Sequence, residues 1–245
     1  RILSSAASDV YKRQFLGRFM SFAPVGGRTA SADVPLRCAV FVSGSGSGMQ
    51  ALVEAQRGRR LPHETVVVVS NRSDAHGLER AKRLDVPTVV VEHEVGGQRL
   101  TRNEHETNVL AALEPFDVEL IVLSGYMRLL SSTFLERWPH RVVNIHPSLL
   151  PHFPGAHAHR DVLAAGVSVS GCTVHMVDEG MDTGARLAQR PVPVFPDDTE
   201  ASLAARIKVE EHRLYPEVLT WIAQGRVHLS GDGVEVAGVE DRLVD

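Results

Sequence analysis

The sequence has few cysteines, no long apolar run and no strong excess of either charge. Its 245 residues include two cysteines, Cys38 and Cys172, and no CxxC pair, which excludes a disulfide framework and a zinc knuckle. The longest apolar runs extend over about six residues, far short of the roughly 20 that a membrane-spanning helix needs. Hydrophobic residues still make up 43% of the chain, enough for a globular core. We therefore expect a folded, cytoplasmic protein with no membrane segment.

The net charge of −4 is distributed unevenly. Residues 231–245 contain five acidic residues and one arginine, and residues 1–33 contain five basic and two acidic residues. The part between them therefore carries about −3 and offers no basic field for a long polyanion. We expect no nucleic-acid partner, although a small phosphate site is compatible with this balance.

The first 33 residues lack the pattern of the rest. They begin with Arg1 and contain serines, arginines and a short apolar cluster, but no periodic apolar spacing. We interpret residues 1–35 as a non-native or disordered extension, and a targeting segment is the alternative. The domain is predicted to span residues 36–230, with residues 231–245 as an acidic hairpin or tail.

Short β-branched runs alternate with helical patterns in the first half of this domain. The predicted strands are 37–42, 65–70, 86–91, 118–124 and 141–145, and the predicted helices are 47–58, 76–84, 99–113 and 131–137. Continuous apolar strands suit a sheet that is covered on both faces. Strands that alternate with helices predict an α/β fold with a doubly wound, mostly parallel sheet.

The order of elements changes in the second half. Residues 171–178 and 185–195 are successive strand-like runs with no room for a crossover helix, so they are predicted to pair antiparallel. A long helix is expected at 199–224, capped by Asp198 or Thr199 and ended by Gly225. A hairpin around residues 231–233 follows. We expect all of these elements to form a single domain.

A glycine-rich loop, SGSGSG at 43–48, follows the first predicted strand and opens a helix. Glycines let the backbone approach an anion, and the first N–H groups of the helix point toward it. Met49 stands where the dinucleotide fingerprint has glycine, and Asn71-Arg72 stands where that fingerprint needs an acid. A Walker lysine is also absent. The loop therefore favours a single phosphate over NAD or ATP, and an ordinary tight turn is the alternative.

The segment NIHPSLLP, residues 144–151, comes directly after the fifth predicted strand. Carboxyl ends of strands are where ligands bind in open α/β sheets. Asn144 and His146 would supply one amide donor and one titratable donor, which suits a developing oxyanion. Three more histidines follow by residue 159, but no HExxH spacing occurs. Residues 146–159 also contain no acid that could serve as a metal ligand or a base. We predict no metal here.

An acidic loop, DEGMDTG at 178–184, joins the two strands that are predicted to be antiparallel. Most such loops are ordinary polar turns. A carboxylate of this loop that reached His146 would favour the imidazolium form and orient the ring. The spacing in the sequence leaves both interpretations open.

These three motifs occur in one order, and together they resemble those of the glycinamide ribonucleotide transformylases, the formyltransferases of purine synthesis. Shorter strings support the resemblance, among them SNR at 70–72, GYMRLL at 125–130, GCTVH at 171–175 and EEH at 210–212. The resemblance runs from about residue 36 to the C-terminus. It implies direct transfer of a formyl group from 10-formyltetrahydrofolate, as cosubstrate, to the amine of 5'-phosphoribosylglycinamide. It also implies that neither a metal nor a covalent enzyme intermediate is used.

The resemblance also implies roles for individual residues. The catalytic residues would be Asn144, His146 and Asp182. The substrate would be bound by Gly46, Ser47 and Gly48 at its phosphate and by Glu211 at its ribose. The folate would be bound by Arg102, Met127, Arg128, Leu129, Leu130, Asn144, Asp178 and Glu179. Gly48 departs from the family, which usually has Asn there, so a side-chain contact to the substrate is in doubt.

The expected chemistry is attack of the amine on the formyl carbon, which makes a tetrahedral oxyanion. Asn144 and a protonated His146 would stabilise that charge, and Asp182 would keep His146 charged and anchor a water that carries the proton. Two enzymes on the same core are alternatives, methionyl-tRNA formyltransferase and formyltetrahydrofolate hydrolase, but each would need a further domain. A non-catalytic phosphate-binding module is the alternative from another class. The oligomeric state is left open, with a homodimer as the candidate.

Overall fold

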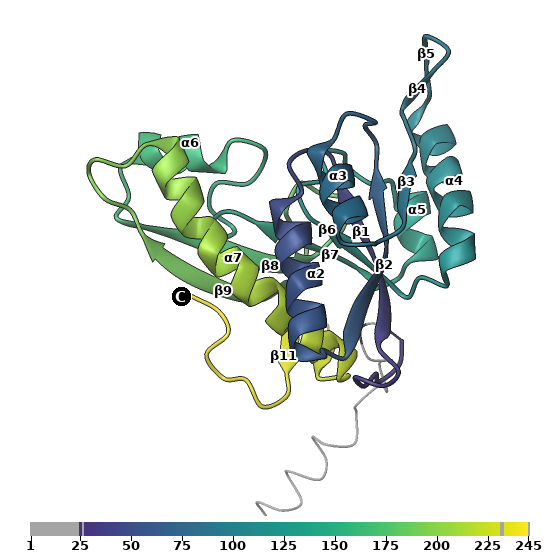
Figure 1. Ribbon diagram of the computed structural model, residues 1–245. Helices are drawn as coiled ribbons and strands as arrows, with labels where there is room; N and C mark the ends of the chain where they lie inside the picture. The colour runs from purple at the N-terminus through teal and green to yellow at the C-terminus, as the bar shows by residue number, and fades with distance from the viewer. Residues whose placement is uncertain (1–24, 26, 231–232, 245) are drawn as a thin grey trace, which may run out of the picture.

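A seven-stranded sheet organises the computed structural model, which describes residues 25, 27–230 and 233–244 (Figure 1). The strand order is β3-β2-β1-β6-β7-β8-β9. The strands are β1 (Leu36–Val42), β2 (His63–Ser70), β3 (Thr88–Val90), β6 (Leu120–Leu123), β7 (Val142–His146), β8 (Val169–Met176) and β9 (Arg186–Pro193). The first five run parallel, whereas β8 pairs antiparallel with both β7 and β9. The predicted fold class is confirmed.

The helices are α2 (Ser47–Arg59), α3 (His76–Arg83), α4 (Arg102–Leu113), α5 (Ser132–Arg137), α6 (Ala158–Ala165) and α7 (Glu200–Ala223), with a 3-10 turn, η1, at Glu114–Phe116. All of the described α-helices except α6 lie at or near their predicted positions. The α7 helix begins after Thr199, whose side chain accepts a hydrogen bond from the backbone N–H of Ser202. No helix among the residues described above is long and apolar enough to cross a membrane.

Strand β1 shows how the two faces of the sheet are filled. Its residues Leu36, Cys38, Val40 and Val42 belong to a buried cluster that also contains the core residues of α2 and α7. The alternate residues 39 and 41 belong to a second cluster with α4 and α5. This alternation follows from the period of two in a strand, and it explains why the strand is apolar on both faces from Cys38 to Val42. Helices α2, α3 and α7 therefore cover one face, and α4 and α5 cover the other (Figure 1).

The chain reverses its direction of winding between β1 and β6. Strands β2 and β3 extend the sheet on one side of β1, and β6 and β7 extend it on the other. The loops after β1 and β6 therefore separate at the carboxyl edge of the sheet, which is where open α/β sheets bind ligands. The buried Ser43 links these loops, because its hydroxyl donates to Oδ1 of Asn71 (2.6 Å) and accepts from the backbone N–H of Met127 (2.9 Å).

The α6 helix, the turn η1 and a small hairpin do not appear among the predictions. The α6 helix lies in the histidine-rich stretch, where eight residues are too few for a clear apolar period. A small hairpin, β4 (Glu94–Val95) with β5 (Gln98–Arg99), occupies the start of the helix expected at 99–113. That helix begins later because Thr101 caps it, with reciprocal bonds to Glu104.

The described part of the predicted extension, residues 25 and 27–35, packs against the domain. Val25 and Ala30 are buried in the core beside α7, and the backbone N–H of Ala30 donates to the carbonyl of Ala223 (2.6 Å). Arg28 forms a two-pronged ion pair with Glu119, with N···O distances of 2.5 and 2.7 Å. The sequence pattern missed this because irregular backbone has no period. For residues 1–24 and 26 the prediction lies outside the described residues.

The C-terminal hairpin forms as predicted, from β10 (Val227–Ser230) and β11 (Gly233–Val236). Its expected turn residues, Gly231 and Asp232, lie outside the described residues. Val227 and Val236 are buried in the core, and the backbone N–H of Gln189 in β9 donates to the carbonyl of Arg242 (2.7 Å). The boundary predicted after residue 230 therefore cuts through a packed hairpin, and it does not separate a tail from the domain.

Candidate active site

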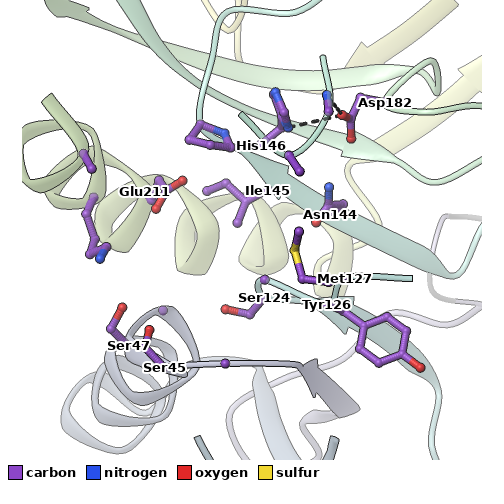
Figure 2. Close-up of a pocket in the computed structure, with 18 of the residues that line it drawn as sticks. Ser45, Ser47, Ser124, Tyr126, Met127, Asn144, Ile145, His146, Asp182 and Glu211 are labelled. Atoms are coloured by element: carbon purple, nitrogen blue, oxygen red, sulfur yellow. Dashed lines mark hydrogen bonds and ion pairs between the residues drawn. The ribbon is translucent and has the colours of Figure 1, made fainter. Parts of the chain in front are cut away.

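A cavity of about 460 Å³ opens at the reversal point between β1 and β6. It is lined by residues 44–48 after β1, 124–129 after β6, 144–147 at the end of β7, 155, 156 and 159, 181–182, and 204, 208 and 211 of α7. Figure 2 shows Asn144, His146 and Asp182 on one side, Ser45 and Ser47 on the opposite side, and Glu211 on α7 facing the space from a third direction. Three separate motifs of the sequence thus share one cavity.

The glycine-rich loop ends at Gly46, which precedes α2 in the left-handed conformation with φ 67°. A side chain there would place its Cβ 2.4 Å from the Cα of Gly77, so the position requires glycine for two reasons. Gly46 supplies no side-chain cap. The first N–H groups of α2 therefore point into the cavity without an intrahelical acceptor, and together with the helix dipole they form a site for an anion.

The acidic loop brings Asp182 between two histidines. Its Oδ2 lies 3.3 Å from Nδ1 of His146, and its Oδ1 lies 3.5 Å from Nε2 of His175. All three side chains are largely buried, with exposed fractions of 5% for His146, 13% for Asp182 and 3% for His175. The loop 178–184 is therefore more than a polar turn, because one of its carboxylates reaches the end of β7.

The backbone holds Asp182 in place. Its φ of 57° is unusual for a residue other than glycine, and its Oδ2 accepts a hydrogen bond from the backbone N–H of Gly155 (2.8 Å). Burial alone would raise the pKa of Asp182, but the hydrogen bond from the backbone N–H of Gly155 and the nearby imidazoles of His146 and His175 outweigh it and hold the pKa at about 2. Asp182 is therefore ionised at neutral pH.

His146 differs from the expectation that Asp182 keeps it charged. Burial lowers the pKa of His146 below 6.5, and the opposing effects of the Phe153 carbonyl and Asp182 do not restore it. The Nε2 atom lies 2.8 Å from the carbonyl oxygen of Phe153, which only accepts, so the proton of a neutral ring is on Nε2. A full bond from Nδ1 to Asp182 requires a second proton. At neutral pH the ring is therefore mainly neutral, and protonation strengthens its contact with Asp182.

Asn144 is oriented by a residue that the sequence did not identify as part of the site. Its Nδ2 lies 3.1 Å from Nε2 of His175, and Nδ1 of His175 lies 2.8 Å from the carbonyl of Met176. That carbonyl takes the ring proton on Nδ1, so a neutral His175 accepts at Nε2 from the amide of Asn144. The second amide hydrogen of Asn144 is left for the cavity.

The sequence pattern also missed two further residues, one that supports the strands beneath the cavity and one that lines it. The hydroxyl of Tyr215 on α7 lies 2.9 Å from the carbonyl oxygen of Leu123 and 3.1 Å from that of Val143, so it ties the end of β6 to β7. Ser124 follows β6 and lines the cavity. For His175 the apolar alternation of β8 was the available signal, since a histidine at a buried position of a strand needs a polar partner.

Glu211 lies on the side of α7 that faces the cavity. Burial raises its pKa to about 7, although the ammonium of Lys208 opposes the shift. Near neutral pH the side chain can therefore exist as a neutral acid or as a carboxylate. Either form can hydrogen-bond hydroxyl groups of a ligand.

The residues predicted to bind folate do not all line this cavity. Met127, Arg128, Leu129 and Asn144 do. Leu130 is buried in the core, and Arg102 is the exposed first residue of α4. Asp178 and Glu179 line a second hollow beside Trp138, and Asp178 accepts hydrogen bonds from Gly180 and Thr183 of its own loop.

Apolar side chains stand exposed at the cavity on the side of the β6 loop. Met127 and Met181 are each more than half exposed, and Leu129 is 44% exposed. Exposed apolar groups beside a polar cavity are typical of a site for a flat organic ligand. In the described part of the chain, no group of three or more His, Cys, Asp or Glu side chains is arranged to hold a metal ion.

Fold and site together define an α/β protein with an anion site and a buried Asn-His-Asp cluster at one reversal point. A family model described as formyl transferase matches residues 36–219. The phosphoribosylglycinamide formyltransferase of Escherichia coli (strain K12) is 36% identical over 190 residues, which cover 78% of this chain and 88% of that protein. The chain belongs to the formyl transferase family.

Further relatives and a solved structure are similar to this chain over most of its length. The trifunctional purine biosynthetic protein adenosine-3 of Gallus gallus is 44% identical over 198 residues, and the match spans 81% of this chain but only 19% of that protein's length. The crystal structure of glycinamide ribonucleotide transformylase 1 from Symbiobacterium toebii superposes with a TM-score of 0.78 at 42% identity, covering 82% of this chain and 94% of that one.

Proposed function

We propose that this chain transfers the formyl group of 10-formyltetrahydrofolate to the amine of 5'-phosphoribosylglycinamide. The observation that carries the proposal is that one cavity joins the anion site at α2 to the buried Asn144-His146-Asp182 cluster. The names of its relatives, among them phosphoribosylglycinamide formyltransferases, support the same substrate. A phosphate held at residues 46–48 would direct the other end of the substrate across the cavity, with Glu211 beside the ribose.

In this proposal the amine nitrogen attacks the formyl carbon and forms a tetrahedral intermediate with a negative oxygen. Asn144 donates its free amide hydrogen to that oxygen. His146 donates from Nε2 once it exchanges the neutral carbonyl of Phe153 for the oxyanion, because a charged oxygen is the stronger acceptor. Collapse of the intermediate breaks the bond between carbon and N10 of the folate.

One proton must move from the attacking nitrogen to the leaving N10. The ionised carboxylate of Asp182, anchored by Gly155, can orient a water that carries it. Holding both substrates in one cavity removes much of the entropy barrier of a reaction between two molecules. The exposed side chains of Met127, Leu129 and Met181 offer the apolar contact that the aromatic parts of the folate need.

The test is a formyl-transfer assay that follows loss of the formyl absorbance of 10-formyltetrahydrofolate. Loss that depends on phosphoribosylglycinamide, with formylated product identified by mass spectrometry, is the expected result. Equal loss without the acceptor would indicate a hydrolase, and binding of both ligands without turnover would indicate a non-catalytic module. The metal-free reaction, the lack of a nucleic-acid partner, the homodimer and the cytoplasmic location stay predictions.

A further inference from the structure

Ser124 lines the cavity between the end of β6 and the start of α2. It follows β6, and its backbone N–H donates to the carbonyl of Phe41 in β1 (2.9 Å), so both strands fix its position. Its side chain lies against the start of α2: a Cβ at Gly48 would come within 2.7 Å of the Ser124 hydroxyl oxygen. Among the residues that the structure describes, apart from the neighbours of Gly48 in its own helix, no other atom lies within 4 Å of that Cβ position. The hydroxyl therefore occupies the space that a side chain at position 48 would need.

The Ser124 hydroxyl is also unused within the part of the protein that the structure describes. No described residue forms a hydrogen bond with its Oγ, and the residue lines the cavity. Figure 2 shows the hydroxyl near Ser47 and below Ile145, in the space between α2 and α7. A polar group at this place faces the same volume as the free N–H groups of α2.

We propose that Ser124 is a substrate-binding residue, whose hydroxyl donates to the phosphate of the substrate and replaces the side chain that is missing at Gly48. The inference rests on the proposed function and deepens it. A phosphate has more acceptor oxygens than the first N–H groups of α2 can satisfy from one side, and Ser124 approaches from the neighbouring strand. Gly48 and Ser124 thus form one unit, in which the absence of a side chain at one position makes room for the hydroxyl at the other.

The first test removes the hydroxyl. Ser124→Ala should weaken binding of 5'-phosphoribosylglycinamide and of inorganic phosphate by about 10- to 100-fold, the range for a lost bond to a charged group. The KM for 10-formyltetrahydrofolate should stay unchanged, and Ser124→Thr, which keeps the hydroxyl, should retain most of the affinity. Ser73→Ala is the matched control, because that serine bonds to Glu92 at the surface. Isothermal titration calorimetry and the melting temperature of each variant provide the readout.

The second test uses the pair. Gly48→Asn alone should weaken phosphate binding, because its Cβ displaces the Ser124 hydroxyl. In the Ser124→Ala background, Gly48→Asn should weaken phosphate binding less or restore it. The space of the Ser124 hydroxyl is then vacant, and the Asn side-chain amide can donate to the phosphate. Additive effects of the two changes would overturn the proposed unit.

The two proposals fail in different ways. If the wild-type chain transfers formyl groups and Ser124→Ala binds substrate and phosphate normally, the role of Ser124 is overturned and the proposed function stands. If phosphate binding depends on Ser124 but no formyl transfer occurs, the proposed function is overturned and the phosphate contact stands. A folded Ser124→Ala variant that loses affinity for folate as well as for phosphate would also contradict the role given to Ser124.

Discussion

The imidazole of His175 and the amide of Asn144 lie 3.1 Å apart, on neighbouring antiparallel strands and directly opposite each other in the register. The same ring lies 3.5 Å from Asp182. His175 therefore contacts two of the three residues that we propose for the chemistry, without lining the cavity itself. We therefore expect His175 to position them.

Two substitutions of His175 should distinguish the contributions of its two ring nitrogens. Asn can present an amide N–H near the place of Nδ1 and preserve the bond to the carbonyl of Met176, whereas Gln reaches about as far as Nε2 and preserves the contact with Asn144. We expect His175→Asn to lower kcat by about tenfold or more and His175→Gln to lower it less. Steady-state kinetics on variants of equal melting temperature provide the check, and equal losses of kcat in both variants would contradict the positioning role.

Asn144 and His146 should behave as donors to one transition-state charge. Loss of one donor of this kind typically costs about 10²–10³ in kcat, so Asn144→Ala and His146→Ala should each show a fall of that size with a smaller change in substrate KM. The double variant should lose less than the product of the two single losses, because both donors act on the same oxygen. Full turnover by a folded His146→Ala variant would rule out this mechanism.

The pKa of His146 should fall further when Asp182 loses its charge. Burial lowers this pKa, and the negative charge of Asp182 raises it in part. Asp182→Asn removes that charge, so the lowering by burial is less compensated. NMR titration of the His146 ring should show protonation beginning at a lower pH in the variant. His63 is the internal control, because burial at the other end of the sheet lowers its pKa to about 4 and it has no contact with Asp182. An unchanged titration of His146 would mean that the two groups are not coupled.

Glu211 should make the stability of the free protein depend on pH. Its pKa is raised from 4.5 to about 7 by burial, so between these values the unfolded chain releases a proton that the folded chain keeps. Stability therefore falls as the pH rises from about 4.5 to about 7. Glu211→Gln lacks this penalty, so its melting temperature relative to the wild type should increase over that range and then level off. Glu210→Gln, where the carboxylate pairs with Arg213, is the neighbouring control.

The segment before β1 should contribute to stability. Arg28→Ala removes both bonds to Glu119 and the bond to the carbonyl of Pro35 (2.8 Å). Since about a third of the Arg28 side chain is exposed, we expect a loss of about 1–2 kcal/mol, or roughly 3–6 °C in Tm. Arg60→Ala is the matched control, because its pair with Asp33 is 79% and 86% exposed and should contribute almost nothing. Equal Tm values for both variants would contradict the role of Arg28.

The sequence predicted the elements that have a strong period or a clear cap. Strand β1 is apolar from Cys38 to Val42 because both faces are buried there, and α7 is capped by Thr199, one of its two predicted caps. Segments without a period were missed, as at Arg28 and in α6. Irregular backbone is stabilised by individual contacts between distant residues, and these leave no repeating pattern in the sequence.

For the candidate site, the sequence by itself determined which residues we propose for the chemistry: the glycines before α2, the donors Asn144 and His146, and the carboxylate of Asp182. Only the tertiary structure decided how they are placed and in what environment. Antiparallel pairing of β7 and β8 places His175 opposite Asn144, and burial makes His146 mainly neutral. Both outcomes depend on desolvation and on distances between strands far apart in the chain. Neither quantity is encoded in the spacing of residues along it.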